Sequence, residues 1–143
     1  MAIRFATEAD LPALLALCAE LHPEEAPLSL TEAGERLRQL LRYPGSGILL
    51  ADGGVATCTL VVIPNLTRGG APYALIENVV TLTAHRKHGH GRAILQAAIA
   101  KAWEAGCYKV MLLTGSKNPA TLDFYKGAGF EQSKTGFQIR EAD

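Results

Sequence analysis

The chain has no excess charge of either sign, few cysteines and no long apolar run. Lys and Arg together number 14, and so do Asp and Glu, in 143 residues. No global field would therefore draw the chain to nucleic acid or to an anionic membrane, and any phosphate binding must be local. The apolar runs 11–21 and 47–63 are too short, or too broken by polar residues, for a membrane span or a secretory segment. We expect a cytoplasmic protein.

The three cysteines, Cys18, Cys58 and Cys107, are odd in number and widely spaced. This pattern fits reduced, buried thiols better than a disulfide framework or a zinc site. Nearly half of the residues are apolar, which is enough to bury a real core at this length. We expect one compact domain over residues 1–143.

Hydrophobic periodicity predicts a mixture of strands and helices. Strands are expected at 3–6, 47–51, 55–63, 73–82 and 109–114, and helices at about 11–21, 31–42, 91–105 and 118–127. A turn at 52–54 makes the second and third strands antiparallel, and the helix 91–105 between the last two strands makes those parallel. Segments 130–133 and 137–140 are expected to form a terminal hairpin or bent strand. The predicted fold class is α/β of the α+β kind, with a mixed, mostly antiparallel sheet and about four helices.

The most informative stretch lies between the strand 73–82 and the helix 91–105. It comprises Arg86, Lys87, His88, Gly89, His90, Gly91 and Arg92. Gly89 and Gly91 have no Cβ, so the backbone can turn tightly and bring N–H groups to an anion at a helix start. The cationic side chains would add to that attraction. The stretch therefore predicts a phosphate cradle.

Two common nucleotide loops do not match this stretch. A P-loop would need Lys followed by Ser or Thr directly after its last glycine, whereas Gly91 is followed by Arg92 and Ala93. A dinucleotide fingerprint needs a third glycine where Ile94 stands, and it belongs to the first strand-to-helix turn of a domain. Neither reading explains the stretch.

The spacing Arg86-x-x-Gly89-x-Gly91 resembles the acetyl-CoA pyrophosphate loop of the GNAT-type N-acetyltransferase superfamily. The resemblance continues through Asn118, Ala120 and the string 124–130, FYKGAGF, which is similar to a second signature of that family. It implies a GNAT fold whose sheet opens between the fourth and fifth strands. It also implies that acetyl-CoA is the co-substrate, and that the chain is an acyltransferase forming a homodimer.

The chemistry requires an amine to lose its proton before it attacks a thioester. Glu77 lies inside an otherwise apolar strand, where burial would suit a general base, and by position it resembles the family's glutamate base. Strand alternation also permits a carboxylate that points to solvent. Tyr125 resembles the family tyrosine that protonates the departing thiolate, although a packed aromatic would look the same.

The resemblance further implies which residues bind acetyl-CoA. Backbone atoms of Val80 and Leu82 would contact the donor, and N–H groups of residues 80–82 would polarise the thioester carbonyl if the strand bulges there. The loop from Arg86 to Arg92 would hold the pyrophosphate, and Asn118 would orient the pantetheine arm. Tyr125 would also lie beside the donor.

The three histidines His85, His88 and His90 raise the question of a metal, but no Cys or carboxylate lies near them in sequence. We expect no metal site. For the acceptor, Glu20, Glu24 and Glu25 would attract a cationic molecule and Arg68 an anionic one, and each of these is equally well an exposed surface charge.

Strand 76–80 and segment 107–110 are similar to glucosamine-6-phosphate N-acetyltransferases, and segment 129–133 to aminoalkylphosphonate N-acetyltransferases. Both similarities favour a small primary amine as acceptor. Two other functions stay open: a non-catalytic acyl-CoA sensor, and an enzyme acting on a protein lysine or N-terminus.

Overall fold

The computed structural model describes residues 2–141 and consists of two compact units, one ending at Leu112 and the other beginning at Leu113. The first unit contains β1 (Ile3–Phe5), α1 (Leu11–Leu21), α2 (Leu30–Leu41), β2 (Gly47–Ala51), β3 (Ala56–Ile63), β4 (Tyr73–Thr81), α3 (His90–Glu104) and β5 (Val110–Leu112). The second unit contains α4 (Pro119–Gly127). Short 3-10 turns precede α1 at Glu8–Asp10 and follow β4 at Thr83–His85.

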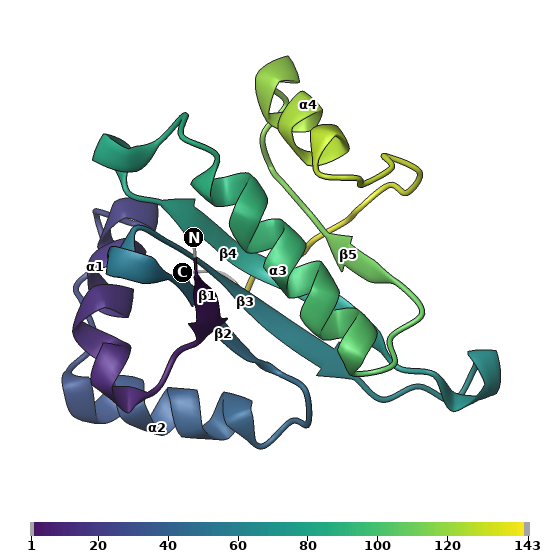
Figure 1. Cartoon of the computed structure of the whole chain (residues 1–143), viewed down its shortest axis with the longest axis horizontal. Coiled ribbons are helices and arrows are strands. Elements are labelled where there is room, and N and C mark those ends of the chain that lie inside the picture. The colour runs from purple at the N-terminus through teal and green to yellow at the C-terminus, as the bar shows by residue number, and fades with distance from the viewer. Residues whose placement is uncertain (1, 142–143) are drawn as a thin grey trace. The chain divides into compact units, whose positions relative to one another are not determined.

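The strands of the described residues form one five-stranded sheet in the order β1-β2-β3-β4-β5 (Figure 1). The first four strands pair antiparallel, and β4 pairs parallel with β5. The predicted hairpin between β2 and β3 is confirmed, since Gly53 and Gly54 have φ values of 75° and 69° that glycine adopts without strain. The predicted parallel crossover through α3 is confirmed as well.

The pairing of β4 with β5 is short. It joins Ala74 to Val110, Leu75 to Met111 and Ile76 to Leu112. From Glu77 to Thr81, β4 continues with no strand on that side among the described residues. The expected opening of the sheet between the fourth and fifth strands is therefore present.

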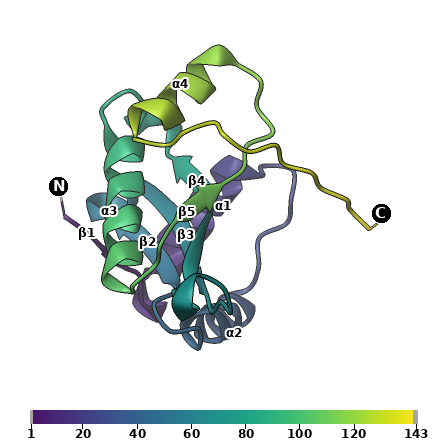
Figure 2. The same cartoon turned by 90° about the vertical axis from the view of Figure 1, so that its right-hand side faces the viewer.

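Helices cover both faces of the sheet in the first unit (Figure 2). On one face, α1 and α2 pack on a core that contains Leu14, Leu17, Leu37, Leu50 and Val80. Alternation along the paired strands turns Leu49, Cys58, Leu60 and Ile76 to the other face, where α3 lies. This packing holds β4 between two helical layers and fixes the strand that leads to the glycine loop.

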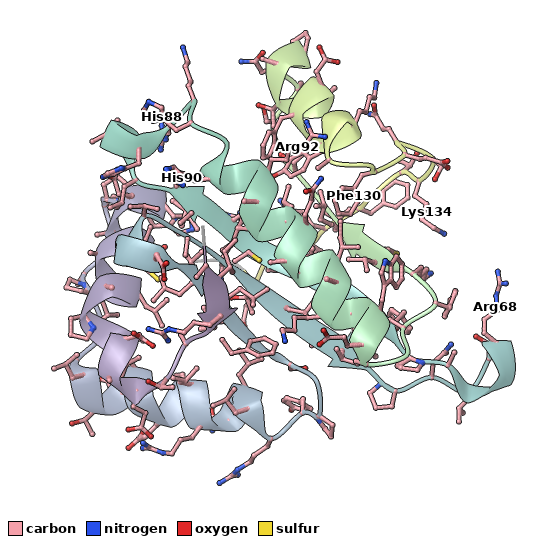
Figure 3. The ribbon with its side chains drawn as sticks, viewed as in Figure 1. Arg68, His88, His90, Arg92, Phe130 and Lys134 are labelled. Carbon is pink, nitrogen blue, oxygen red and sulfur yellow. The ribbon has the colours of Figure 1, made fainter. Side chains whose placement is uncertain are left out.

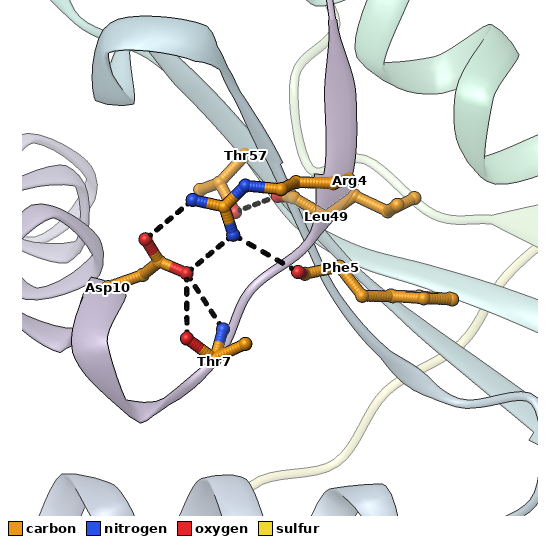
Figure 4. Close-up of polar contacts among 6 residues, drawn as sticks. All are labelled: Arg4, Phe5, Thr7, Asp10, Leu49 and Thr57. Carbon is orange, nitrogen blue, oxygen red and sulfur yellow. Dashed lines mark hydrogen bonds and ion pairs between the residues drawn. The ribbon is translucent and has the colours of Figure 1, made fainter.

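The chain enters α1 through a polar contact among Arg4, Thr7 and Asp10 (Figure 4). The Arg4 guanidinium donates to both oxygens of Asp10, at 2.7 and 2.8 Å, and the Thr7 N–H donates to Asp10 Oδ2 at 2.8 Å. Arg4 first, and then the Thr7 N–H, hold the pKa of the Asp10 carboxyl well below its usual range. In the same region the buried Thr57 hydroxyl donates to Leu49 O at 2.5 Å, which satisfies it within the sheet.

Two expectations about burial and pairing are wrong. Residues 130–141 contain no strand, and the side chains of Phe137 and Ile139 are 89% and 98% exposed, so a strand there would have no buried face to stabilise it. Cys18 is exposed, because it lies outside the apolar stripe of α1, whereas Cys58 and Cys107 are buried as expected. In the part of the chain that the structure describes, no helix is both long and apolar enough to cross a membrane.

Candidate functional site: the glycine loop and the strand before it

The glycine loop joins the 3-10 turn Thr83–His85 to α3. Lys87 and Gly89 have positive φ values of 65° and 82°, so the backbone reverses twice within three residues. The left-handed region is costly for side chains with a Cβ and open to glycine, which explains why glycine stands directly before the helix. The loop therefore delivers the chain into α3 with its first amides facing outward.

The first turn of α3 lacks a side-chain cap. Its N-cap residue is Gly89, and the first amide that reaches back along the helix is that of Ala93, which donates to Gly89 O at 3.0 Å. The amides before Ala93 have no carbonyl within the helix to receive them. Such a terminus attracts anions through its N–H groups and its dipole.

The loop and the first turn of α3 carry three cationic side chains, Arg86, Lys87 and Arg92, of which Figure 3 labels Arg92. Arg86 is exposed, and its Nε donates to Thr81 O at 3.2 Å. Lys87 and Arg92 are exposed, and within residues 2–141 neither has a carboxylate within ion-pair distance. Glycine backbone, helix amides and three cations are a donor set that fits a pyrophosphate.

A residue of α1 holds the turn in front of the loop. The Thr83 N–H donates to Glu20 Oε1 at 3.2 Å, and the Thr83 hydroxyl donates to Glu20 Oε2 at 2.8 Å. The hydroxyl contact, followed by the amide contact, lowers the pKa of Glu20. Both oxygens are thus engaged by Thr83, so Glu20 supports the turn before the loop, and its expected role in attracting a cationic acceptor stays a prediction.

Strand β4 contains a bulge in its pairing with β3. Thr57 pairs with Val80 and Thr59 with Glu77, so β4 has one residue more than β3 between these pairs. The extra residue falls at Asn78 or Val79, and Asn78 has a φ of 53°. The N–H groups of residues 80–82 were expected to polarise a thioester carbonyl if the strand bulged there, whereas the bulge lies directly after Glu77.

Backbone groups of Leu82 are engaged within the chain. The Leu82 N–H donates to Val55 O at 2.9 Å, and Leu82 O accepts from the His85 N–H at 2.8 Å. The N–H expected to polarise a thioester carbonyl is therefore already bonded. Val80 is buried, and its side chain packs in the core beneath α1 and α2.

Glu77 is exposed, and the desolvation expected for it is absent. It shares a face of the sheet with Thr59, its partner in β3, and with Leu75. Those neighbours are only half buried, so α1 and α2 do not cover this part of the face. The carboxylate lies next to the bulge and before the open part of β4, where a water or an amine can reach it.

The second unit holds the other two expected residues. Asn118 caps α4, since its Oδ1 accepts from the Ala120 N–H at 3.0 Å, while its own N–H donates to Ser116 Oγ at 3.2 Å. The Asn118 side chain is exposed, and its Nδ2 is left as a donor. This cap confirms the predicted start of the helix.

Tyr125 lies on α4 between two aromatic rings. Its ring centroid is 5.1 Å from that of Phe124 and 6.5 Å from that of Phe130, both in edge-to-face geometry. The Phe130 N–H donates to Tyr125 O at 3.2 Å. The half-buried ring is thus held in place within its unit.

The loop histidines contact one another. The His90 ring lies 6.1 Å from His85 and 6.3 Å from His88, edge to face in both cases. Among the described side chains, those that bring three ligand atoms within 4.8 Å of one another are His22, Glu24 and Glu25, and all three are exposed. Glu24 and Glu25 lie 3.5 and 3.8 Å from His22 Nδ1.

Comparison with known proteins agrees with this geometry. The acetyltransferase (GNAT) family model matches residues 12–130. A putative acetyltransferase from Agrobacterium tumefaciens str. C58 has 49% identity and a TM-score of 0.92, with 99% of this chain and 100% of that one covered. A transcriptional regulator from Bacillus halodurans C-125 has 28% identity and a TM-score of 0.83, over 98% and 99% of the two chains.

A glucosamine 6-phosphate N-acetyltransferase from Trypanosoma brucei brucei is 36% identical over 76 residues, which is 53% of this chain and 50% of that protein. The match to this curated relative thus spans half of its length. The family model, by contrast, runs from α1 through the glycine loop to Phe130 and includes the bulged strand. The chain therefore belongs to the acetyltransferase (GNAT) family.

Proposed function

We propose that the chain is an acetyl-CoA-dependent N-acetyltransferase that acts on a primary amine of a small molecule. The observation that carries the proposal is the uncapped start of α3 behind the glycine loop, directly after a bulged strand, in a chain of this family. The donor set at that start fits the pyrophosphate of acetyl-CoA. Acetyl-CoA, when bound, supplies an acetyl group as a thioester that the amine displaces.

The glycine loop would bind the donor. Its amides and the side chains of Arg86, Lys87 and Arg92 would hold the pyrophosphate, with His88 and His90 beside it. Because one helix start contributes only about 0.3–1 kcal/mol to an exposed anion, amides and cations must act together. Asn118 Nδ2 would orient the pantetheine arm.

Glu77 would take the proton of the acceptor amine, through a water molecule. Its exposure supports this route, since a solvent-accessible carboxylate can relay a proton without entering an apolar pocket. Asn78 and Val79 fall in the bulge and outside the register pairs, so their N–H groups replace that of Leu82 as the proposed donors to the thioester carbonyl. Tyr125 would return a proton to the departing thiolate.

A small amine is proposed because the curated relative acts on glucosamine 6-phosphate. The amines to compare are glucosamine 6-phosphate, other amino sugars, polyamines, aminophosphonates, amino acids and peptides. The assay measures release of CoA thiol from acetyl-CoA in the presence of each one. Release that depends on a small amine supports the proposal. CoA binding without such release indicates a sensor, and release with peptides alone indicates a protein acetyltransferase.

The homodimer and the cytoplasmic location stay predictions. Sedimentation at micromolar concentration would test the first, and fractionation of cells that express the chain would test the second.

A further inference from the structure

A cluster of cations and aromatic rings lies at the end of β4 opposite to the glycine loop. The Arg68 guanidinium carbon is 5.1 Å from the centroid of the Tyr108 ring, and Lys109 Nζ is 5.4 Å from the same centroid. Lys109 Nζ also lies 5.3 Å from the Tyr73 ring, and the two rings meet edge to face at 6.5 Å. Two positive charges thus converge on one ring.

Within residues 2–141, neither of these charges has a carboxylate within ion-pair distance. Lys101 offers a comparison, because its Nζ lies 5.6 Å from the Phe5 ring and also 3.2 Å from Glu104 Oε2. Lys101, over the Phe5 ring, is thus paired with a carboxylate, whereas Arg68 and Lys109 can pair with an external anion.

The backbone holds the cluster in place. The Tyr108 N–H donates to Pro72 O and the Ala74 N–H donates to Lys109 O, both at 3.0 Å, so Tyr73, Tyr108 and Lys109 are fixed to one another. Both rings are half buried. Apolar surface beneath a cation weakens solvent screening and strengthens its attraction for an anion.

The loop that carries Arg68 is also ordered. Asn65 Nδ2 donates to Thr67 O at 3.2 Å and to Ala71 O at 3.1 Å, which closes the loop across its base. Arg68 has a φ of 54°, a conformation that a long side chain seldom adopts. The closed loop thus fixes the backbone from which Arg68 reaches the Tyr108 ring.

From these contacts we infer that Arg68 and Lys109, over the Tyr73 and Tyr108 rings, form a second anion site that binds the phosphate group of a small molecule. The site is separate from the glycine loop. Figure 3 shows Arg68 at one end of the first unit and His88 at the other, and β4 runs nine residues between them. Two cations match the charge of a phosphate monoester, and a guanidinium can pair with two of its oxygens.

The test is an NMR titration of the ¹⁵N-labelled protein with glucose 6-phosphate in saturating CoA. This ligand has no amine to be acetylated, and CoA occupies the glycine loop. We expect shifts at the amides of Arg68, Tyr108 and Lys109. The Arg68→Gln, Lys109→Gln double variant should bind about tenfold more weakly, because it loses two charge-assisted contacts. Lys101→Gln is the matched control and should bind as the wild type does.

A parallel titration with inorganic phosphate shows whether the site recognises the phosphate group alone or also the rest of the ester. Equal affinity assigns recognition to the phosphate group itself, and tighter binding of the ester assigns part of it to the rest of the ligand; both support the site. Equal shifts with chloride at matched ionic strength, or unchanged affinity in the double variant, would overturn it. Failure of CoA to bind would contradict the proposed function. The second anion site would still be tested by the affinities of the wild type, the double variant and the control for the phosphate ligand.

Discussion

The starts of α2 and α3 differ in what satisfies their amides. At α2, the Ser29 hydroxyl accepts from the Glu32 N–H at 3.1 Å, and Asn118 does the same for α4. At α3 the N-cap is Gly89, with a φ of 82° and no side chain to accept a hydrogen bond. Side chains of the N-cap residues accept from the first amides of α2 and α4, whereas the N-cap residue of α3 has no side chain that could do so. The absence of a side-chain cap, together with a cationic loop, therefore distinguishes α3, which is proposed to bind an anion, from α2 and α4.

The largest effect is expected for a substitution on α4, the helix that carries Tyr125 and whose start is capped by Asn118. Replacing Tyr125 with Phe removes the proposed acid and keeps the ring against Phe124 and Phe130. Turnover should fall about 100-fold. Affinity for CoA, measured by calorimetry, should stay within about twofold. Unchanged turnover would remove Tyr125 from the mechanism.

Gly89→Asp would place a carboxylate directly before the amides that begin α3. The new carboxylate would compete for the first amides and repel the pyrophosphate, so CoA affinity should fall to about a tenth or less. Gly89→Asn caps without charge and tolerates a positive φ, so it serves as the control that isolates repulsion. If both variants bind CoA as the wild type does, the start of α3 does not hold the donor.

Glu20→Gln would weaken the support behind the uncapped start. A neutral amide accepts less strongly from the Thr83 hydroxyl and amide, so the turn before the loop should loosen. The KM for acetyl-CoA should rise about fivefold and kcat should change less. Glu35→Gln, at an exposed position of α2, is the control. Equal KM values in the two variants would contradict the supporting role.

Ser29→Ala would test the capped start itself. Loss of the hydroxyl that accepts from Glu32 should lower the free energy of unfolding by about 1 kcal/mol. CoA affinity should not change. Urea denaturation and calorimetry measure the two quantities, and a change in CoA affinity would show that the two helix starts are not independent.

The smallest effect is expected for the polar contact before α1. Because Arg4 and Thr7 lower the folded pKa of Asp10, the contact stabilises the fold above the unfolded pKa, about 3.9, and is lost as pH falls through the folded value. The gap in melting temperature between wild type and Asp10→Asn should be present at about pH 6 and shrink toward about pH 2. A gap independent of pH would assign the stabilisation to packing.

Local patterns in the sequence were enough for much of the fold. The turn at Gly53 and Gly54, the parallel crossover and the start of α4 at Asn118 each depend on neighbouring residues, and each was predicted. The glycine loop was found in the same way, because its signal lies within seven residues.

Features that depend on distant partners were missed. Glu20 and Thr83 are 63 residues apart, and nothing local marks Glu20 as the support of the loop. The bulge is defined by the register of β3 against β4, so its position could not be read from β4 alone. The exposure of Glu77 depends on how far α1 and α2 extend over the sheet, which the alternation of one strand does not contain.

Cys18 and Cys58 differ in exposure, so their rates of chemical labelling can report the opening of the first unit. Burial raises the pKa of Cys58 to about 12, so this thiol is almost never ionised while the sheet is closed. Cys18 lies exposed on α1, two residues before Glu20. A thiol reagent would therefore modify Cys18 in the native state and reach Cys58 only as β3 is uncovered. The ratio of the two labelling rates would report how often the core around Cys58 opens.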